Sequence, residues 1–123
     1  MSIRAGGSIL ESAEIAKKAI EAALEKQAAD ILMLDIRQVS SFADYFVICS
    51  ADSDRQIKAI CDEIDEVLSR QGVALYRHEG TEDSGWVLLD FSQVIVHVFV
   101  PSQREYYDLE QLWDKATPVI RIQ

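Results

Sequence analysis

The sequence predicts an α/β domain in which a mixed sheet of about five strands is covered by helices, in the order α-β-β-α-β-β-β-α. Three observations lead to this prediction. Two short apolar runs are typical of strands buried on both faces, a longer segment repeats apolar residues every three or four positions, and three later runs are rich in β-branched and aromatic residues. A chain of 123 residues, 49% of them apolar, is long enough to bury one core.

Composition and the chain's beginning suggest how the chain is organised. We expect residues 1–7 to be a loose segment and residues 8–123 to form a single domain. No run of 18 or more apolar residues occurs, and the first residues lack the apolar core of a signal peptide. We therefore expect a cytoplasmic protein without a membrane segment. Cys49 and Cys61 lie within apolar patterns, which predicts reduced core thiols.

The first predicted helix begins at an S-x-x-E capping box, Ser8 to Glu11. Behind this box, apolar side chains recur on one helical face: Ile9, Ala13, Ala16, Ile20, Ala23 and Leu24. The two apolar runs that follow, residues 30–36 and 45–50, are expected to be central strands.

The clearest helix runs from Asp54 to Gln71, where apolar residues form one stripe and Gly72 is placed to end the helix. Ser53 and Gln56 form an S-x-x-Q capping box, in which the Gln56 side chain would reach back to Ser53. Asp52 and Asp54 then lie beside the positive end of the helix dipole.

The same aspartates form a D-x-D triplet, which leaves a second interpretation open. A magnesium-dependent nucleotidyltransferase or nucleotide-binding enzyme could use Asp52 and Asp54, with Asp90 as a further carboxylate. Such a site needs a third carboxylate or a phosphate-gripping Gly-Ser turn nearby, and neither is evident around the triplet. The capping interpretation therefore predicts no catalytic residue, no metal and no cofactor here.

The second half of the chain predicts three strands and a final helix. Residues 73–79, 85–91 and 94–100 are joined by links short enough for an antiparallel meander. The helix at 54–71 connects its two flanking strands as a β-α-β crossover, which predicts that they are parallel. Ser102 to Glu105 is a further S-x-x-E box, and one face of the last helix would carry Tyr106, Leu109, Trp113 and Ala116.

Few residues in the sequence are arranged for catalysis. His97 lies in an apolar strand and is interpreted as a core or sheet-face residue rather than a base or metal ligand. His78 and Glu79 are adjacent in a strand and point to opposite faces. Residues 79–85 form an acidic hairpin loop. The net charge of −9 argues against nucleic acid as the main contact and allows a basic protein partner.

Trp86 begins a predicted strand beside this acidic loop. Strand alternation places Trp86 and Asp90 on one face and Val87, Leu89 and Phe91 on the other. The second face is entirely apolar and is the better candidate for the core. Trp86 and Asp90 are then a plausible exposed pair, an apolar anchor beside a charge, although a Trp86 packed under a helix of its own domain is an equal alternative.

Several stretches resemble the signature blocks of the ribosomal silencing factor family, also called RsfS or Iojap. They are "SSFADYFVICSADSDRQIKAI", "EGTEDSGWVLLDFSQVIVHVF" and "REYYDLEQLW", and the similarity extends from about residue 9 to residue 113. The chain departs from the family's S-G-T-S with S-A-D-S at residues 50–53, so the turn there can differ.

The resemblance implies a nucleotidyltransferase-like fold without catalytic carboxylates. It also implies binding to the large ribosomal subunit through ribosomal protein L fourteen, which blocks joining of the small subunit and represses translation when nutrients are scarce. The partner contact would involve Trp86, Asp90 and Phe91, with Glu82 in the preceding loop. Phe91 conflicts with its assignment to the core face, unless a bulge or strand end turns it outward. A homodimer that uses its own apolar surface remains a third possibility.

Overall fold

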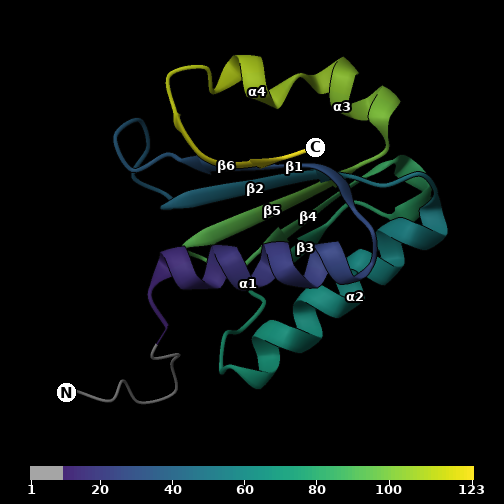
Figure 1. The fold of residues 1–123 in the computed structure, drawn as a ribbon, viewed down its shortest axis with the longest axis horizontal. Helices are drawn as coiled ribbons and strands as arrows, with labels where there is room; N and C mark the ends of the chain where they lie inside the picture. Colours follow the sequence, from purple (N-terminus) through teal and green to yellow (C-terminus); the bar gives the residue numbers. More distant parts are fainter. Residues whose placement is uncertain (1–9) are drawn as a thin grey trace.

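A computed structural model describes residues 10–123 and has a six-stranded sheet with strand order β3-β4-β5-β2-β1-β6 (Figure 1). The elements in chain order are α1 Ser12–Glu25, β1 Ala29–Asp35, β2 Tyr45–Ser50, α2 Asp54–Arg70, β3 Arg77–Glu79, the 3₁₀ helix η1 Glu82–Ser84, β4 Trp86–Asp90, β5 Val94–Phe99, α3 Pro101–Tyr107, α4 Leu109–Leu112 and β6 Thr117–Ile122. The predictions for residues 1–7, Ser8 and Ile9 lie outside the described residues.

The sheet is mixed, as predicted. β2 and β5 are parallel, whereas the other neighbouring strands are antiparallel, including the predicted meander β3-β4-β5. β2 and β3 run in the same direction but are not neighbours, because β4 and β5 lie between them. The number of strands is corrected from about five to six, since β6 pairs with the outer edge of β1. The periodicity of β6 gave no sign of a strand, because most of its side chains are exposed.

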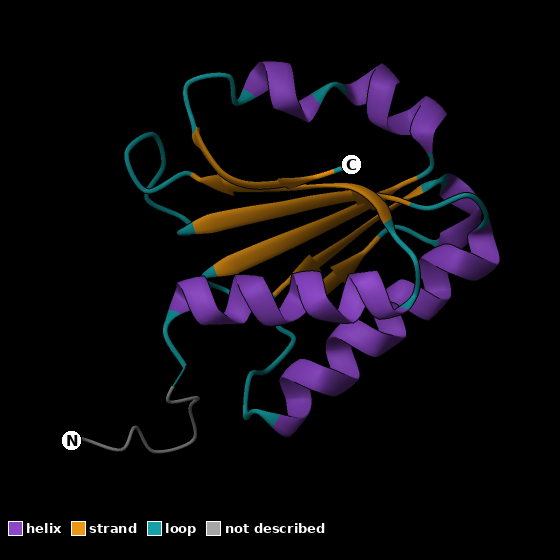
Figure 2. Cartoon of the chain, viewed as in Figure 1, coloured by secondary structure: helices purple, strands orange, loops and turns teal. Residues whose placement is uncertain are grey.

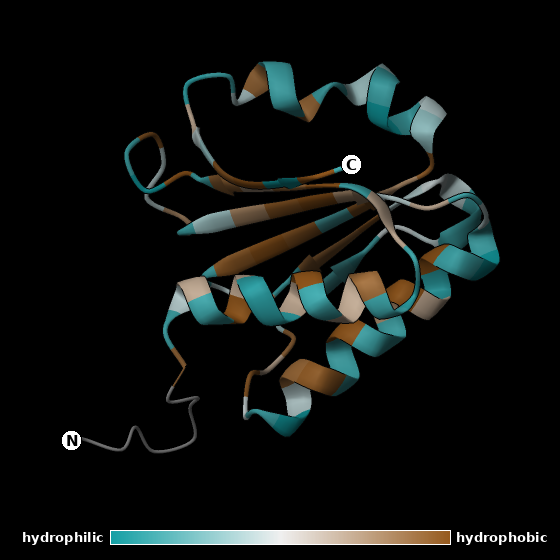
Figure 3. Cartoon of the chain, viewed as in Figure 1, coloured by the Kyte–Doolittle hydropathy of each residue, from teal (hydrophilic) through white to brown (hydrophobic). Residues whose placement is uncertain are grey.

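Helices cover both faces of this sheet: α1 and α2 lie on one side and α3 and α4 on the other (Figures 1 and 2). Val47 and Cys49 of β2 face α1 and α2, whereas Phe46 and Ile48 face α4. The central strands are accordingly mostly hydrophobic in Figure 3. The runs at 30–36 and 45–50 therefore occupy the buried, interior positions that their composition predicts.

Both cysteines are buried and form no disulfide, as predicted. Burial disfavours the thiolate and raises the pKa of Cys49 and of Cys61 to about 12. These thiols are protonated side chains of the core.

Two predicted helix boundaries are wrong. α1 begins at Ser12, with Glu11 as its N-cap residue, so the box that starts at Ser8 does not place the helix start. The predicted Ser102–Glu105 box does not cap α3, because Pro101 is already the first helical residue and Val100 precedes it. The expected final helix is also broken, since Asp108 has a left-handed backbone (φ 48°) between α3 and α4. Tyr106 is consequently exposed, while Trp113 and Ala116 pack against the sheet.

The start of α2 confirms the capping interpretation. Ser53 Oγ accepts from the Gln56 backbone N–H at 3.1 Å. The Gln56 side chain does not return to Ser53 but accepts from the Asp52 backbone N–H at 2.6 Å. Its Nε2 donates to the carbonyl oxygens of Lys26 and Gln27, at 3.0 and 2.9 Å. Gln56 thus joins the start of α2 to the end of α1, whose last carbonyls have no partner within the helix.

We expect Gln56→Ala to lower the free energy of unfolding by about 1–3 kcal/mol, because it leaves polar backbone groups of two helix ends without partners. Gln56→Glu should be at least as destabilising, since a carboxylate cannot donate to the two carbonyl oxygens. Urea unfolding followed by circular dichroism measures both changes. As a control, Lys58→Ala removes only an exposed ion pair with Asp62 and should change stability by less than about 0.5 kcal/mol. A Gln56→Ala variant as stable as the Lys58→Ala variant would contradict the prediction.

Candidate partner-binding site

The D-x-D triplet lies at the start of α2. Asp52 and Asp54 are exposed on either side of the Ser53 cap. Among residues 10–123, no group of three or more His, Cys, Asp or Glu side chains is arranged to hold a metal ion. The geometry of the triplet is therefore that of a helix start.

Trp86 lies at the start of β4 and is half-buried. Its ring stacks on Phe99, with 5.0 Å between centroids, and contacts Tyr107 of α3 at 4.4 Å. The indole Nε1–H donates to His97 Nδ1 at 3.3 Å. Trp86 thus combines the two alternatives drawn from the sequence, because α3 covers part of its ring and the rest remains accessible.

The backbone before Trp86 is held by the acidic loop. Gly80 has φ +84°, and a Cβ added there would lie 2.2 Å from the Trp86 carbonyl oxygen. The same carbonyl accepts from Ser84 Oγ at 3.0 Å. The close approach requires glycine at position 80, so the loop fixes where β4 begins.

Trp86 and Asp90 line the same hollow, of about 600 Å³, which we call the aromatic hollow. Its wall includes Phe42, Tyr76 and Trp113, and the rings of Phe42 and Trp113 contact each other at 5.8 Å. Phe42 and Tyr76 are 58% and 71% exposed. Neither residue was predicted from the sequence as a site candidate. A large aromatic residue in a polar loop before a strand is a signal that could have found Phe42, whereas Tyr76 lies within the predicted strand 73–79 and carries no such signal.

Asp90 forms the polar side of the hollow. One carboxylate oxygen accepts from the Ser92 backbone N–H at 2.7 Å, and the other lies 3.6 Å from the Arg77 guanidinium. The Asp90 side chain is 20% exposed, whereas that of Arg77 is 62% exposed. The carboxylate is therefore fixed in position while its cationic neighbour is largely in solvent.

The structure separates the other two predicted contact residues from this hollow. Phe91 is 2% exposed and packs in the core on the α1–α2 side, so the idea that it turns outward is wrong. Strand alternation continues through Phe91, which is why it faces the core with Val87 and Leu89. Glu82 lies in η1 near α2, close enough to Lys58 to help raise the pKa of that amine, although Asp62 does so more strongly. It does not line the aromatic hollow.

His97 lines the hollow from β5, on the same sheet face as Trp86. It is 4% exposed, so the prediction of a sheet-face residue in the core is confirmed. Burial lowers the pKa of His97 to about 4, and the imidazole is neutral at pH 7.

This low pKa predicts a loss of stability in acid. The unfolded chain binds a proton at His97 near the ordinary pKa of about 6.5, whereas the folded chain does so only near pH 4. Stability from this group is therefore fully present above about pH 6.5 and falls by about 3 kcal/mol as the pH drops to about 4. Urea unfolding of wild type and His97→Leu at intervals between pH 7 and pH 4 measures the difference in stability. The carboxylates of the chain titrate alike in both proteins, so their contribution cancels in this difference. A difference in stability that is constant over this range would contradict the prediction.

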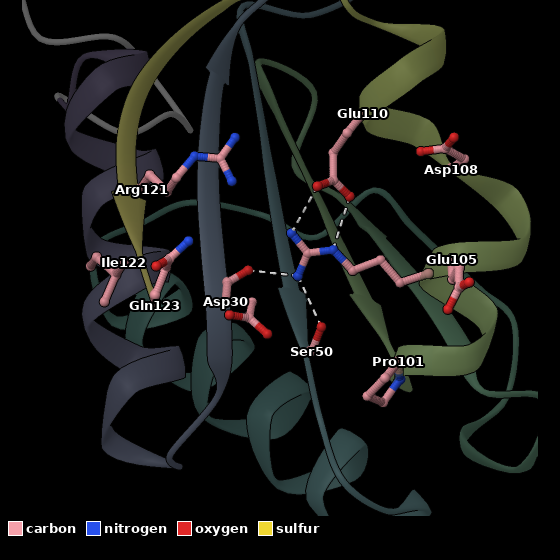
Figure 4. A pocket seen from close by; sticks show the side chains of 10 residues that line it. Asp30, Ser50, Pro101, Glu105, Asp108, Glu110, Arg121, Ile122 and Gln123 are labelled. Atoms are coloured by element: carbon pink, nitrogen blue, oxygen red, sulfur yellow. Dashed lines mark hydrogen bonds and ion pairs between the residues drawn. The ribbon is translucent and has the colours of Figure 1, made fainter.

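A second pocket, of about 350 Å³, lies near the end of β2 and is built around Arg104 of α3 (Figure 4). The guanidinium donates to both carboxylate oxygens of Glu110, at 2.9 and 3.4 Å, and to Ser50 Oγ and the Asp30 carbonyl oxygen, at 2.9 and 2.6 Å. All of its nitrogens are engaged, so Arg104 connects α3 and α4 to the sheet rather than offering a free charge to a ligand.

No helix in the described part of the chain is long and apolar enough to cross a membrane.

Comparison with known proteins gives consistent results. A family described as "Ribosomal silencing factor during starvation" matches residues 9–123. The chain is 44% identical to the ribosomal silencing factor RsfS of Bacillus subtilis over 83% of this chain and 86% of the relative. It is 38% identical to RsfS of Halalkalibacterium halodurans, over 89% of this chain and 94% of that one. A solved structure from Chromobacterium violaceum superimposes with a TM-score of 0.82 and is 39% identical, over 85% of this chain and 88% of that one.

Proposed function

The chain belongs to the ribosomal silencing factor family, and from this premise we propose that it binds the large ribosomal subunit through ribosomal protein L fourteen. Bound there, it excludes the small subunit by its bulk and represses translation when nutrients are scarce. This action needs only occupancy of the surface, and it takes place in the cytoplasm, where the subunits join. The observation that carries the proposal is the aromatic hollow, in which Trp86 and Asp90 lie together.

The hollow has the composition of a protein-docking site. Its phenylalanine, tyrosine and tryptophan side chains come from five parts of the chain: the loop before β2, β2 itself, the segment before β3, β4 and the end of α4. Phe42 and Tyr76 remain exposed although they are large and apolar. Aromatic residues gathered in a partly buried pocket are the usual anchors of a protein interface, because they exchange a large apolar area with the partner at little cost in side-chain entropy.

Charge supports a basic partner. The chain carries a net charge of −9, and the hairpin that holds Trp86 contains Glu79, Glu82, Asp83 and Asp90 against Arg77. A basic ribosomal protein would be attracted to this side of the molecule, and Asp90 offers a fixed carboxylate at the edge of the apolar anchor. In our proposal the contact centres on Trp86 and Asp90, with Phe42 and Tyr76 added and buried Phe91 left out.

Co-sedimentation of the purified protein with isolated large and small subunits tests the proposal, followed by a subunit-joining assay. We expect binding to the large subunit alone and reduced joining in proportion to occupancy. Excess isolated L fourteen should compete for the protein. Binding to neither subunit, or binding to large subunits with joining unaffected, would refute the proposed function.

Asp90→Asn tests the charge. The amide keeps an oxygen that accepts from Ser92, so the turn should survive, while the charge facing the partner is lost. We expect binding to the large subunit to weaken by about 5- to 20-fold at low salt and to depend less on salt concentration. Asp62→Asn, on the exposed face of α2, is the matched control and should bind like wild type. Equal salt dependence for wild type and Asp90→Asn would contradict a role for this carboxylate.

A further inference from the structure

The aromatic hollow contains a polar group whose presence stability does not explain. His97 is the one histidine in β5, an otherwise apolar strand, and it is 4% exposed among Phe46, Trp86 and Phe99. Its Nδ1 accepts from the Trp86 indole, but among the described residues no group bonds its Nε2. Burying a polar nitrogen without a partner opposes folding, and an aliphatic residue would avoid that cost. Departures of this kind from packing rules are expected where function requires them.

The hydrogen bond defines the state of the imidazole. An indole N–H can only donate, so His97 Nδ1 must be unprotonated and the ring proton lies on Nε2. Burial lowers the pKa of His97 and keeps the ring neutral, so Nδ1 remains an acceptor at neutral pH. The arrangement is therefore a fixed acceptor directed at a single donor, the Trp86 Nε1–H.

The ring contacts of Trp86 do not fix its orientation on their own. Phe99 stacks on the indole with an interplanar angle of 23°, and Tyr107 packs against it at 4.4 Å. Trp χ2 has two broad minima about a half-turn apart around the Cβ–Cγ bond, and stacking on a ring face does not by itself specify which of them is occupied. The half-turn would carry Nε1 away from His97 and break the directional bond.

We propose that His97 is a positioning residue for the anchor Trp86: its Nδ1 selects one orientation of the indole and occupies the indole N–H, so that the partner meets the ring and not the donor. The inference rests on the proposed function, because the anchor's role is binding to the large subunit. A side chain held in its bound orientation before contact loses less conformational freedom on binding. The contribution appears as affinity, through Trp86, and not as a contact of His97 with the partner.

Two nearly isosteric substitutions separate positioning from packing. His97→Asn keeps an acceptor oxygen near the place of Nδ1, whereas His97→Leu has a similar shape and no acceptor. If His97 only fills space, Leu should be at least as good as Asn, because the surroundings are apolar. If it positions Trp86, we expect the His97→Asn variant to bind large subunits about 3- to 10-fold more tightly than the His97→Leu variant. The His97→Asn variant would then bind better although it is the less stable of the two.

The test has two readouts. In the free protein, nuclear magnetic resonance should show that the Trp86 indole N–H is protected from solvent exchange in wild type, partly protected in His97→Asn and unprotected in His97→Leu. The signal is assigned to Trp86 by its absence from the spectrum of Trp86→Phe. In binding, the difference between Asn and Leu should vanish in the Trp86→Phe background, which lacks the donor. An indole signal unchanged in His97→Leu, Leu binding as tightly as Asn, or an Asn-Leu difference that persists with Phe at position 86 would overturn the proposal. If wild type binds no large subunit, the proposed function fails, and the indole signal alone decides whether His97 positions Trp86.

Discussion

Replacing Trp86 with alanine is expected to weaken binding to the large ribosomal subunit by at least about 30-fold, the effect of losing a central anchor worth about 2 kcal/mol or more. The half-buried indole lines the aromatic hollow together with Asp90, and Tyr107 packs against its ring. Trp86 and Leu88 also line a smaller cavity together with Tyr107, so truncation of the indole removes part of the wall of both spaces. Titration of labelled protein with purified large subunits measures the change.

The same substitution also removes packing, so a matched control is needed. Ile60→Ala on α2 deletes a fully buried side chain on the opposite face of the sheet and should cost about 2–5 kcal/mol of stability. At a temperature where both variants remain folded, Ile60→Ala should bind large subunits like wild type while Trp86→Ala does not. Equal loss in both variants would show that stability, and not the anchor, governs binding. Tight binding by Trp86→Ala would refute the assignment of the anchor.

The second large effect is on stability and concerns Arg104. Replacing this residue with methionine should lower the free energy of unfolding by about 2–4 kcal/mol, because it leaves the Glu110 carboxylate, the Ser50 hydroxyl and the Asp30 carbonyl without their shared donor. The Arg104 side chain is only 11% exposed, so water replaces these bonds poorly. Urea unfolding measures the loss.

Two further variants show whether the unpaired Glu110 carboxylate causes the loss of stability in Arg104→Met. Arg104→Met combined with Glu110→Leu removes both charges and should recover part of the lost stability. Arg104→Lys keeps the charge but cannot reproduce the forked geometry, and should lie between wild type and methionine. A double variant no more stable than Arg104→Met would contradict the proposed cause. Since Arg104 holds α3, which carries Tyr107 against Trp86, the methionine variant should also bind large subunits less tightly.

The family and the general fold class could be predicted because they depend on patterns spread along the chain. The extended apolar run of β2 and the stripe of α2 report local periodicity, and Ser53 reports a helix start through a bond to a residue three positions away. The failures occur where local signals compete. S-x-x-E at residues 102–105 resembles a cap, but Pro101 and the left-handed Asp108 determine where α3 begins and ends.

Local patterns are enough to predict the two central strands, the capped helix α2 and the core face of Val87, Leu89 and Phe91, because side-chain alternation and capping are properties of neighbouring residues. What covers the other face of β4 depends on the tertiary structure. It places Tyr107 on Trp86, and it gathers Phe42, Tyr76 and Trp113 around a hollow with Asp90. It also gives Gln56, Arg104 and His97 partners on other segments, which lie between 11 and 74 positions away along the chain. Such contacts depend on how distant segments pack together, and no periodicity within one segment encodes that.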